Sequence, residues 1–438
     1  MTSVGGCLPG LAAAPAHRVG ISPEEALARV LGRIDPLPGH DVPVWSALDG
    51  VLVETVRSDT PLPVFDNSAM DGYAVRSVDV GDGRRLRVVG DVRAGRPAVL
   101  HVGPGEACRV MTGAPLPAGA DTVVPYELTK TSDSAGERAT RLTELPPAWI
   151  EVDEPVAQGR HVRRVGEDVE AGQVLATAGT VVGPGEVALF SAVGHASVRV
   201  SRPPVVAVLS TGDELSPAGD PLAPARVHDA NGPALCALVR RAGGIPVEGA
   251  LVPDRPDALL ERLESLAGSV DLVITSGGAS AGAADFVARL AESRHEVEAL
   301  LVAMKPGKPL VVGRVDAPEG RRVPLIGLPG NPVAAMVAFE VFAGPAIARL
   351  RGLRHDGVRV VEALAADELR ATPGRVSFTR VRVERDDDGQ LVAGATGDGC
   401  GHGVRSLIGA NALAVLPPEQ GDVLPGDRVT VRLTKWST

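Results

Sequence analysis

The 438-residue chain has little cysteine and few aromatic residues. Its four cysteines, Cys7, Cys108, Cys236 and Cys400, are scattered and form no CxxC pair. This spacing argues against a disulfide framework and against a zinc site, and is typical of isolated cytosolic thiols. Aromatic residues make up only 3% of the chain, so a loop that holds two of them stands out.

The chain also lacks a long apolar run and an excess of positive charge. No uninterrupted apolar stretch approaches the roughly 18 residues that a membrane span needs, so we expect no membrane contact and a cytoplasmic protein. Residues 1–20 have no basic segment before their apolar part and are predicted to be a disordered tail rather than a signal peptide. The net charge of −10 argues against binding to nucleic acid or anionic lipid.

Three apolar runs each end abruptly in a loop of Gly, Ser, Thr and Pro, at Val205–Leu215, Asp271–Gly282 and Val323–Phe342. Continuous Val/Ile/Leu runs without alternation favour strands that are buried on both faces of a parallel sheet. The carboxyl ends of such strands form the usual binding crevice of open α/β sheets. Three loops at one edge therefore predict a single site for a large ligand that bears phosphate.

The glycines of these loops fit that interpretation. Gly277, Gly278 and Gly330 allow a close backbone approach and positive φ angles. A helix that follows such a loop offers unpaired N–H groups to an anion. Each loop alone is better explained as a tight strand-to-helix turn, and only the three together favour a ligand site.

The chain divides by pattern into several parts. A helix is expected from the Ser22-Pro23-Glu24-Glu25 start, where Ser22 is the N-cap and Glu25 completes a capping box. Short runs split by Gly and Pro indicate strands from Val42 to about Ile150 and again from Val358, and the α/β pattern lies between these parts. The predicted fold class is α/β plus β in several domains, with a mostly parallel α/β domain, β-rich domains and a C-terminal β-barrel-like domain. The expected divisions are a tail at 1–20, a linker subdomain at 21–45 plus 151–187, a β-rich subdomain at 46–150, the α/β domain at 188–353 and the C-terminal β domain at 354–438.

Polar motifs outside the three loops add candidate ligands. Asp71 lies in the segment FDNSAMDGYAVR, which on its own is also explained as an Asx-turn surface loop. Carboxylates recur at Asp168, Glu214, Asp229 and Asp285, and oxygen ligands of this kind suit Mg²⁺ together with phosphate.

A basic turn completes the set of polar motifs. In KPGKP, Lys305 and Lys308 flank a Pro-Gly turn and are suited to hold an oxyanion, although a bend with two solvated lysines is the simpler reading.

The ordered set FDNSAMDGYAVR, MTGAP, RRVGEDV, STGDEL, SGG-x-S-x-G, KPGKP and GLPGNP closely resembles the MoeA family of molybdopterin molybdenumtransferases, which includes the E domain of gephyrin. The resemblance covers about residue 21 to the C-terminus. It implies an elongated four-subdomain homodimer. It also implies a reaction in which adenylylated molybdopterin and molybdate give molybdenum cofactor and AMP with Mg²⁺, downstream of the enzyme that adenylylates molybdopterin.

The resemblance also implies roles for particular residues. Asp71 and Thr112 are expected to face the α/β loops of the other subunit. The implied catalytic residues are Asp71, Thr112, Asp168, Glu214, Lys305 and Lys308. The implied ligand-binding residues are Ser276, Gly277, Gly278, Pro306, Pro309, Gly330 and Asn331. The implied metal ligands are Glu214, Asp229 and Asp285.

Departures from the family pattern at Ala230, Ala283 and the segment 399–401 leave two other functions open. One is a non-catalytic scaffold that binds partner peptides. The other is a relative that holds molybdopterin or a nucleotide without turnover.

Overall fold

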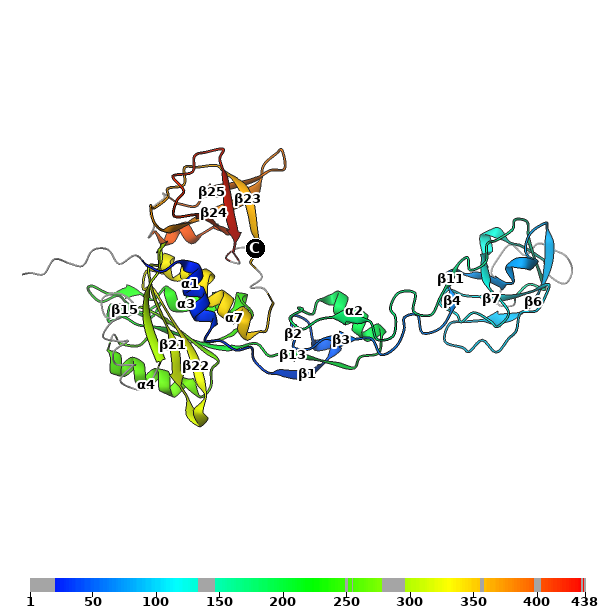
Figure 1. Ribbon diagram of the computed structural model, residues 1–438, viewed down its shortest axis with the longest axis horizontal. Coiled ribbons are helices and arrows are strands. Elements are labelled where there is room, and N and C mark those ends of the chain that lie inside the picture. Colours follow the sequence, from blue (N-terminus) through cyan, green and yellow to red (C-terminus); the bar gives the residue numbers. More distant parts are fainter. Residues whose placement is uncertain are drawn as a thin grey trace, which may run out of the picture.

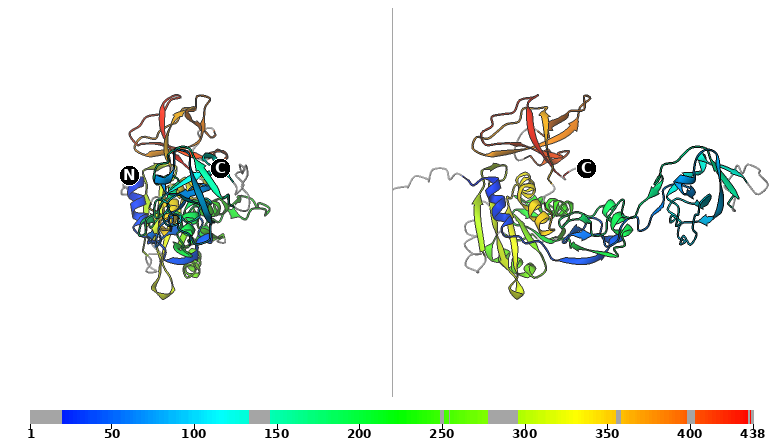
Figure 2. Two further views of the ribbon diagram at one scale, coloured as in Figure 1. Left: turned by 90° about the vertical axis from the view of Figure 1, so that its right-hand side faces the viewer. Right: turned by 45° about the vertical axis from the view of Figure 1, so that its right-hand side comes forward.

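The computed structural model describes residues 20–132, 146–248, 251–253, 255–277, 296–354, 358–397, 403–434 and 436. The predicted tail at residues 1–19 lies outside them. The molecule is elongated: an α/β domain and a β-barrel lie at one end, and a linker unit leads to a β-rich distal unit at the other end (Figure 1). The right-hand view of Figure 2 shows the same extended arm, with the barrel stacked on the α/β domain.

The α/β domain is built on a six-stranded sheet. In spatial order its strands are β17 (Ile245–Glu248), β14 (Val205–Ser210), β18 (Leu272–Ser276), β22 (Arg322–Leu328), β21 (Pro309–Asp316) and β19 (Glu296–Leu301). The first four strands are parallel, β21 runs antiparallel to them, and β19, antiparallel to β21, again runs in their direction. The prediction of a mostly parallel sheet is confirmed.

Helices cover both faces of this sheet. One face packs against α1 (Pro23–Leu31), α3 (Asn231–Arg241), α6 (Pro332–Ala338), the π-helical η5 (Phe339–Ala343) and α7 (Gly344–Leu350), and the other packs against α4 (Pro256–Ala267). Along β14, Val206 and Val208 face the first core while Ala207 and Leu209 face the second. Burial on both faces explains why the strands are continuously apolar.

The stretch Pro332–Leu350 is long and apolar enough in composition to cross a membrane. In the structure, 78% of its apolar window is buried. It runs as α6, η5 and α7 through the larger of the two cores of the α/β domain, and this packing accounts for its composition.

Helix α1 begins as predicted but packs elsewhere than predicted. Ser22 Oγ accepts the Glu25 N–H at 3.1 Å, whereas the Glu25 carboxylate pairs with Arg29 at 2.7 Å, so only half of the capping box forms. The apolar stripe of the helix, which includes Ala26 and Val30, is buried in the α/β core. The start of the chain therefore belongs to the α/β domain and not to the linker.

The linker unit has its own small core. It contains β1 (Gly39–Pro43), η1 (Val44–Ser46), β2 (Val51–Leu52), β3 (Val56–Arg57), β12 (Val174–Ala176), α2 (Pro184–Ala192) and β13 (Ser197–Ser201). Phe190 of α2 is fully buried in this core beside Val198 and Val200 of β13. The predicted boundary at residue 188 thus falls inside α2, and the linker extends to Ser201.

The distal unit is β-rich. Its six-stranded sheet consists of β8 (Thr122–Pro125), β5 (Gly72–Val75), β7 (Glu106–Val110), β6 (Arg84–Val92), β10 (Trp149–Val152) and β9 (Lys130–Ser132). The pair β4 (Asn67–Ser68) and β11 (Val162–Arg163) closes it toward the linker, with η2 (Ser77–Asp79) and η3 (Tyr126–Leu128) as short turns. Because β11 returns to pair with β4, the unit extends past residue 150.

The C-terminal part forms a closed barrel of five strands. They are β24 (Val376–Arg385), β25 (Leu391–Ala395), β23 (Val360–Ala365), β27 (Arg428–Leu433) and β26 (Ala412–Leu416), and the pairing of β26 with β24 closes the ring. The expected hairpin with an Asp-Gly turn is the β24–β25 pair. Two 3-10 helices, η4 (Pro318–Gly320) and η6 (Val404–Leu407), lie in the α/β domain and the barrel.

Candidate active site

Three strand ends meet at one edge of the α/β sheet, as the sequence predicts. Ser210 of β14 pairs with Ser276 of β18, and Ser276 pairs with Leu328 of β22. Because these strands are parallel, the loops that follow them lie side by side. The edge therefore brings Ser276, Gly277 and Gly330 together.

Asn231, the first residue of α3, ties two of these loops to each other. Its side-chain amide donates to Ser276 Oγ at 2.7 Å and to the carbonyl of Gly330 at 2.7 Å. Ser276 Oγ in turn donates to the carbonyl of Pro329 at 3.2 Å. Asn231 is only 8% exposed and Ser276 only 1%, so the clamp lies beneath the loops and fixes their spacing.

The glycine at the first of these loops is required by its surroundings. Gly277 has φ of +94°, and a Cβ there would lie 2.2 Å from the carbonyl oxygen of Thr211. A Cβ on Gly330 would meet Gly277 Cα at 3.5 Å. The two loops are in close backbone contact, which leaves their N–H groups as the chemistry available to a ligand.

Asn331, predicted as a ligand-binding residue, is the N-cap of α6. Its side-chain oxygen accepts the Ala334 N–H at 3.1 Å. Its carboxamide oxygen therefore has a structural use. Gly278 and Asp285 lie outside the described residues.

The KPGKP turn lies at the same sheet edge. Strand β21 starts at Pro309 and runs antiparallel to β22, with Val311 opposite Gly327, so its first residues lie beside the end of β22. Lys305 and Lys308 are both exposed. Gly307 is buried with φ of +105°.

A two-residue strand at the start of this turn contacts the barrel. β20 (Met304–Lys305) pairs with β24 of the barrel and not with β21. The turn lies in the connection of the β19–β21 hairpin, in which Leu301 pairs with Pro309, and its pairing with β24 also ties it to the barrel. This position explains how two exposed lysines are held at a fixed place beside the glycine loops.

The predicted acids of the α/β domain lie next to this edge. Glu214 is exposed and precedes β15 (Leu215–Ser216), and Asp229 follows β16 (Val227–His228), so the two lie at opposite ends of a short parallel ladder. Asp229 Oδ1 accepts the N–H groups of Asn231 and Gly232 at 2.9 and 3.1 Å. Within the described residues no group of three His, Cys, Asp or Glu side chains is placed to hold a metal ion.

A small cradle remains beside Asp229. A Cβ on Gly232 would lie 2.5 Å from Asp229 Oδ2 and 3.1 Å from Ser210 Oγ, so only glycine leaves this space open. Ser210 Oγ and Asn231 Oδ1 are buried and have no hydrogen-bond partner in the described part of the chain. Buried polar atoms without partners are uncommon in folded proteins and call for an explanation such as an unplaced water or ion.

The remaining predicted residues lie on the distal unit. Asp71 Oδ1 accepts both the main-chain N–H and the hydroxyl of Thr112, at 2.7 and 2.8 Å. These bonds, with the main-chain bond the stronger influence, hold the pKa of Asp71 below its usual value. Asp71 and Thr112 are exposed, so the Asp71 carboxylate, held by two hydrogen bonds, faces solvent.

The other polar residues of the FDNSAMDGYAVR segment are structural. Asn67 donates to the carbonyl of Phe65 at 3.2 Å, and buried Ser68 donates to the carbonyl of Met70. Asp66 accepts the Val165 N–H at 2.9 Å and pairs with Arg164 at 2.6 Å, and these contacts lower the pKa of Asp66.

Asp168 lies on the segment that follows β11. It is exposed, and its N–H donates to the carbonyl of Leu62 at 3.0 Å. The two groups of predicted residues thus lie at opposite ends of the elongated molecule, one on the distal unit and one at the edge of the α/β sheet (Figure 1).

Sequence reasoning missed the Asn231 clamp. Its partners are 45 and 99 residues away along the chain, so no local pattern reveals them. The available signal was an Asn at the start of a helix, two residues after the carboxylate Asp229.

A mostly parallel sheet with interlocked glycine loops at its carboxyl edge defines a ligand-binding α/β domain, here joined to a β-barrel and a long β-rich arm. The chain belongs to the MoeA family. The MoeA N-terminal region (domain I and II) matches residues 21–194, a probable molybdopterin binding domain matches residues 207–349, and the MoeA C-terminal region (domain IV) matches residues 362–434.

Relatives with curated names support this membership. The chain is 36% identical over 401 residues to molybdopterin molybdenumtransferase 2 of Mycobacterium tuberculosis, which covers 89% of this chain and 94% of the relative. It is 33% identical over 410 residues to the molybdopterin molybdenumtransferase of Haemophilus influenzae, which covers 93% and 97%.

Solved structures agree. Two crystal structures of the molybdopterin biosynthesis MoeA protein of Pyrococcus horikoshii superpose with TM-scores of 0.78 and 0.76, at 30% and 27% identity, and cover 96% and 94% of this chain and 100% of each structure.

Proposed function

We propose that this protein inserts molybdate into adenylylated molybdopterin and releases AMP, as a step in molybdenum cofactor biosynthesis. The observation that carries the proposal is the convergence, at one sheet edge, of the clamped glycine loops and the KPGKP turn. The relatives named above are molybdopterin molybdenumtransferases, and no comparison supports a scaffold or a non-catalytic binding protein.

Each part of the edge has a distinct task in this reaction. The loop N–H groups around Ser276, Gly277 and Gly330, continued by Gly278, bind the phosphates of the substrate. Lys305 and Lys308, held by Pro306 and Pro309, attract molybdate as point charges. The dithiolene sulfurs of the pterin are the metal ligands, since the described cysteines Cys108 and Cys236 are both buried.

The donor set beside Asp229 fits a magnesium ion. Mg²⁺ is commonly held by one or two carboxylates together with substrate phosphates and water. Asp229 Oδ2, at the cradle left open by Gly232, would be such a ligand. Glu214, at the other end of the β15–β16 ladder, and Asp285 are further candidates from the sequence. The ion would neutralise charge on the phosphates while the pyrophosphate link is broken.

The site is proposed to be shared between two copies of the chain. Asp71, Thr112 and Asp168 lie on the distal arm, far from the sheet edge of their own chain, so they act only if the arm reaches the α/β domain of a second copy (Figure 1). Exposed apolar side chains surround these acids, and such a surface is typical of a contact with another protein. They are Val64, Phe65, Met70 and Val165, each between 39% and 54% exposed.

We further expect the protein to act in the cytoplasm as a homodimer, and to receive its substrate from the enzyme that adenylylates molybdopterin. We expect no binding to nucleic acid or membranes, given the net charge of −10.

The test is AMP release from adenylylated molybdopterin after molybdate is added in the presence of Mg²⁺. Release that depends on both molybdate and Mg²⁺ is expected. Tight binding of the adenylylated pterin without AMP release would show a ligand-binding relative instead, and no binding at all would favour the scaffold.

A further inference from the structure

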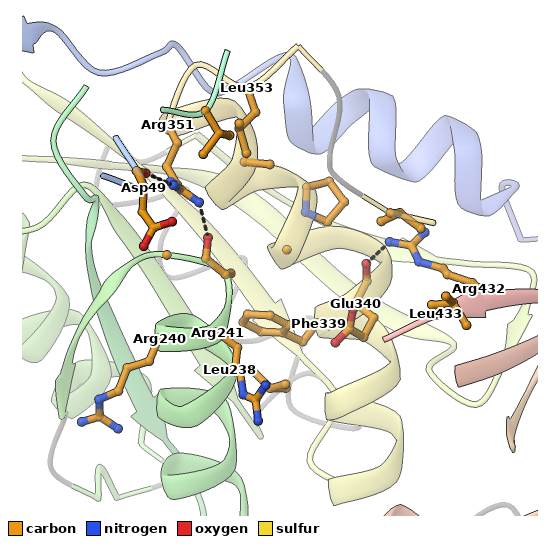
Figure 3. Close-up of a pocket in the computed structure, with 17 residues that line it drawn as sticks. Asp49, Leu238, Arg240, Arg241, Phe339, Glu340, Arg351, Leu353, Arg432 and Leu433 are labelled. Atoms are coloured by element: carbon orange, nitrogen blue, oxygen red, sulfur yellow. Dashed lines mark hydrogen bonds between the residues drawn. The ribbon is translucent and has the colours of Figure 1, made fainter. Parts of the chain in front are cut away.

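The arm joins the α/β domain at a crevice that contains a cavity of about 490 Å³ (Figure 3). The linker contributes Asp49 and Val181, the end of α3 contributes Ala242 and Gly243, and the segment after α7 contributes Arg351. The barrel also reaches this crevice through Arg432 and Leu433.

The linker and the α/β domain do not share a core. The buried apolar residues of the linker gather around Phe190, and those of the α/β domain form a separate cluster. Units that lack a large hydrophobic interface are expected to move relative to each other. The orientation of the arm therefore depends on the polar contacts at the crevice.

Arg351 makes three of these contacts. Its guanidinium donates to the carbonyl of Asp49 in the linker at 2.8 Å and to the carbonyl of Ala242 in the α/β domain at 3.2 Å (Figure 3). Its own carbonyl accepts the hydroxyl of Ser201, at the end of β13, at 2.7 Å. One residue thus bridges both units through its side chain and its main chain.

The surroundings are shaped to hold this guanidinium. Gly243 has φ of +85°, and a Cβ there would lie 2.4 Å from Arg351 Nη1. Burial lowers the pKa of Arg351, which fits a cation bound to carbonyls at a domain junction. Because guanidinium is planar and carries several donors, it can bond two carbonyls at once, which an ammonium group at a fixed position does less well.

We propose that Arg351 is a positioning residue that fixes the angle of the arm and thereby the place of Asp71 in the reaction. The proposal rests on the proposed function, in which the arm of one copy completes the site of another. The arm is long, so a small rotation at Arg351 becomes a large displacement of Asp71, and a misplacement of about 1 Å at a reacting centre can cost on the order of 100-fold in rate.

Three substitutions at the joint and one control test this role. Arg351→Met keeps the length of the side chain and removes its donors, and Arg351→Lys keeps the charge with one mobile ammonium. Gly243→Ala places a methyl group against Nη1 and displaces the guanidinium without altering it. Arg240→Met is the control, because Arg240 lines the same cavity but is exposed at the end of α3.

The first readout is the distance between the arm and the body, measured by pulsed electron spin resonance without substrate. Spin labels go on the exposed positions Val99, on the arm, and Glu261, on α4, each changed to Cys. Cys7 and Cys400 are changed to Ser, and an excess of unlabelled protein leaves only distances within one chain. The buried Cys108 and Cys236 are left in place.

The second readout is steady-state AMP release, with the thermal midpoint of each variant as a check on folding. We expect a broadened distance distribution for Arg351→Met and Gly243→Ala, together with a fall of kcat by roughly 10- to 100-fold and an unchanged KM for molybdate. Arg351→Lys is expected to recover part of both, and Arg240→Met to match the parent protein.

Two results overturn the proposal: an unchanged distance distribution in Arg351→Met and Gly243→Ala, or a broadened distribution with parental kcat. Failure of the proposed function is recognised separately, since the parent protein would then release no AMP while the distances still report on the joint. If Arg351→Met does not fold, Gly243→Ala and Arg351→Lys decide by the same criteria.

Discussion

Replacing Asp71 by Asn separates the charge of this residue from its place in the fold. Asp71 Oδ1 accepts two hydrogen bonds from Thr112, and an Asn oxygen at the same position can accept both. The loop should therefore keep its shape while the carboxylate charge disappears.

The expected loss of stability is small. A hydrogen bond to a charged group contributes about 1.5–3 kcal/mol and a neutral one about 0.5–1.5 kcal/mol, so two bonds set an upper limit of a few kcal/mol. Asp71 is exposed, and solvent screening reduces this to about 1 kcal/mol or less. The thermal midpoint should fall by at most a few degrees.

The expected loss of activity is large. If the Asp71 carboxylate takes part in proton transfer or charge stabilisation at the shared site, turnover should fall by about 100-fold or more. The assay is AMP release at saturating molybdate, beside a thermal melt of the same sample. Asp82→Asn is the control, since Asp82 is an exposed acid of the same unit with φ of +57°, which Asn also tolerates.

The reasoning would be refuted if Asp71→Asn lowered the thermal midpoint strongly while its residual activity matched the folded fraction. Asp71 would then be a structural residue of the loop. Equal activity losses in Asp71→Asn and Asp82→Asn would also contradict it.

Three further predictions concern other residues. Lys305→Ala and Lys308→Ala should each raise the molybdate concentration required for AMP release by roughly 10- to 150-fold, the equivalent of one charged hydrogen bond, with less effect on binding of the adenylylated pterin. Titration of AMP release with molybdate measures this, and the parental molybdate dependence in both variants would show that the turn is structural. Cys108, whose pKa burial raises to about 12, should resist alkylation at pH 8 in the native protein and react once it is denatured, as mass spectrometry will show. Burial also raises the pKa values of Tyr73 and Tyr126 to about 12. Both protonated rings therefore stabilise the folded state below the unfolded pKa of about 10, and this contribution to the free energy of unfolding should be lost as the pH rises from about 10 to 12. In urea unfolding, the free energy of unfolding of Tyr126→Phe should depend less steeply on pH in that range, and an unchanged slope would contradict the assignment.

Much of the fold follows from local sequence. The apolar runs that became β14, β18 and β22 are continuous because both faces of the sheet are covered, and this pattern indicates a buried parallel strand without further information. The β24–β25 hairpin and the N-cap at Ser22 are likewise local features.

The structural features that the sequence did not predict depend on contacts between distant parts of the chain. The apolar stripe of α1 shows that the helix is buried, but not that it packs on the α/β domain. Phe190 shows a core position in α2, but not that this core belongs to the linker. The short strand β20, which includes Lys305, pairs with β24 of the barrel, and no residue near Lys305 predicts this pairing.

The same distinction applies to the site. The glycine loops were recognisable because tight turns and close backbone approach require glycine locally. The Asn231 clamp was not, since it joins three segments through side-chain bonds. The crowded polar residues near Asp71 favoured a polar site, yet Asp66, Asn67 and Ser68 mainly hold the loop together.

The central claim is that the arm of one copy and the sheet edge of another form one active site, and co-expression of two inactive variants tests it most directly. One variant carries Asp71→Asn on the arm, the other carries Lys305→Ala with Lys308→Ala at the sheet edge, and AMP release is measured at a molybdate concentration too low to support the lysine variant. Random pairing makes half of the dimers mixed, each with one intact site of two, so the mixture should recover about a quarter of the parental AMP release. A mixture as inactive as either variant alone would contradict a shared site.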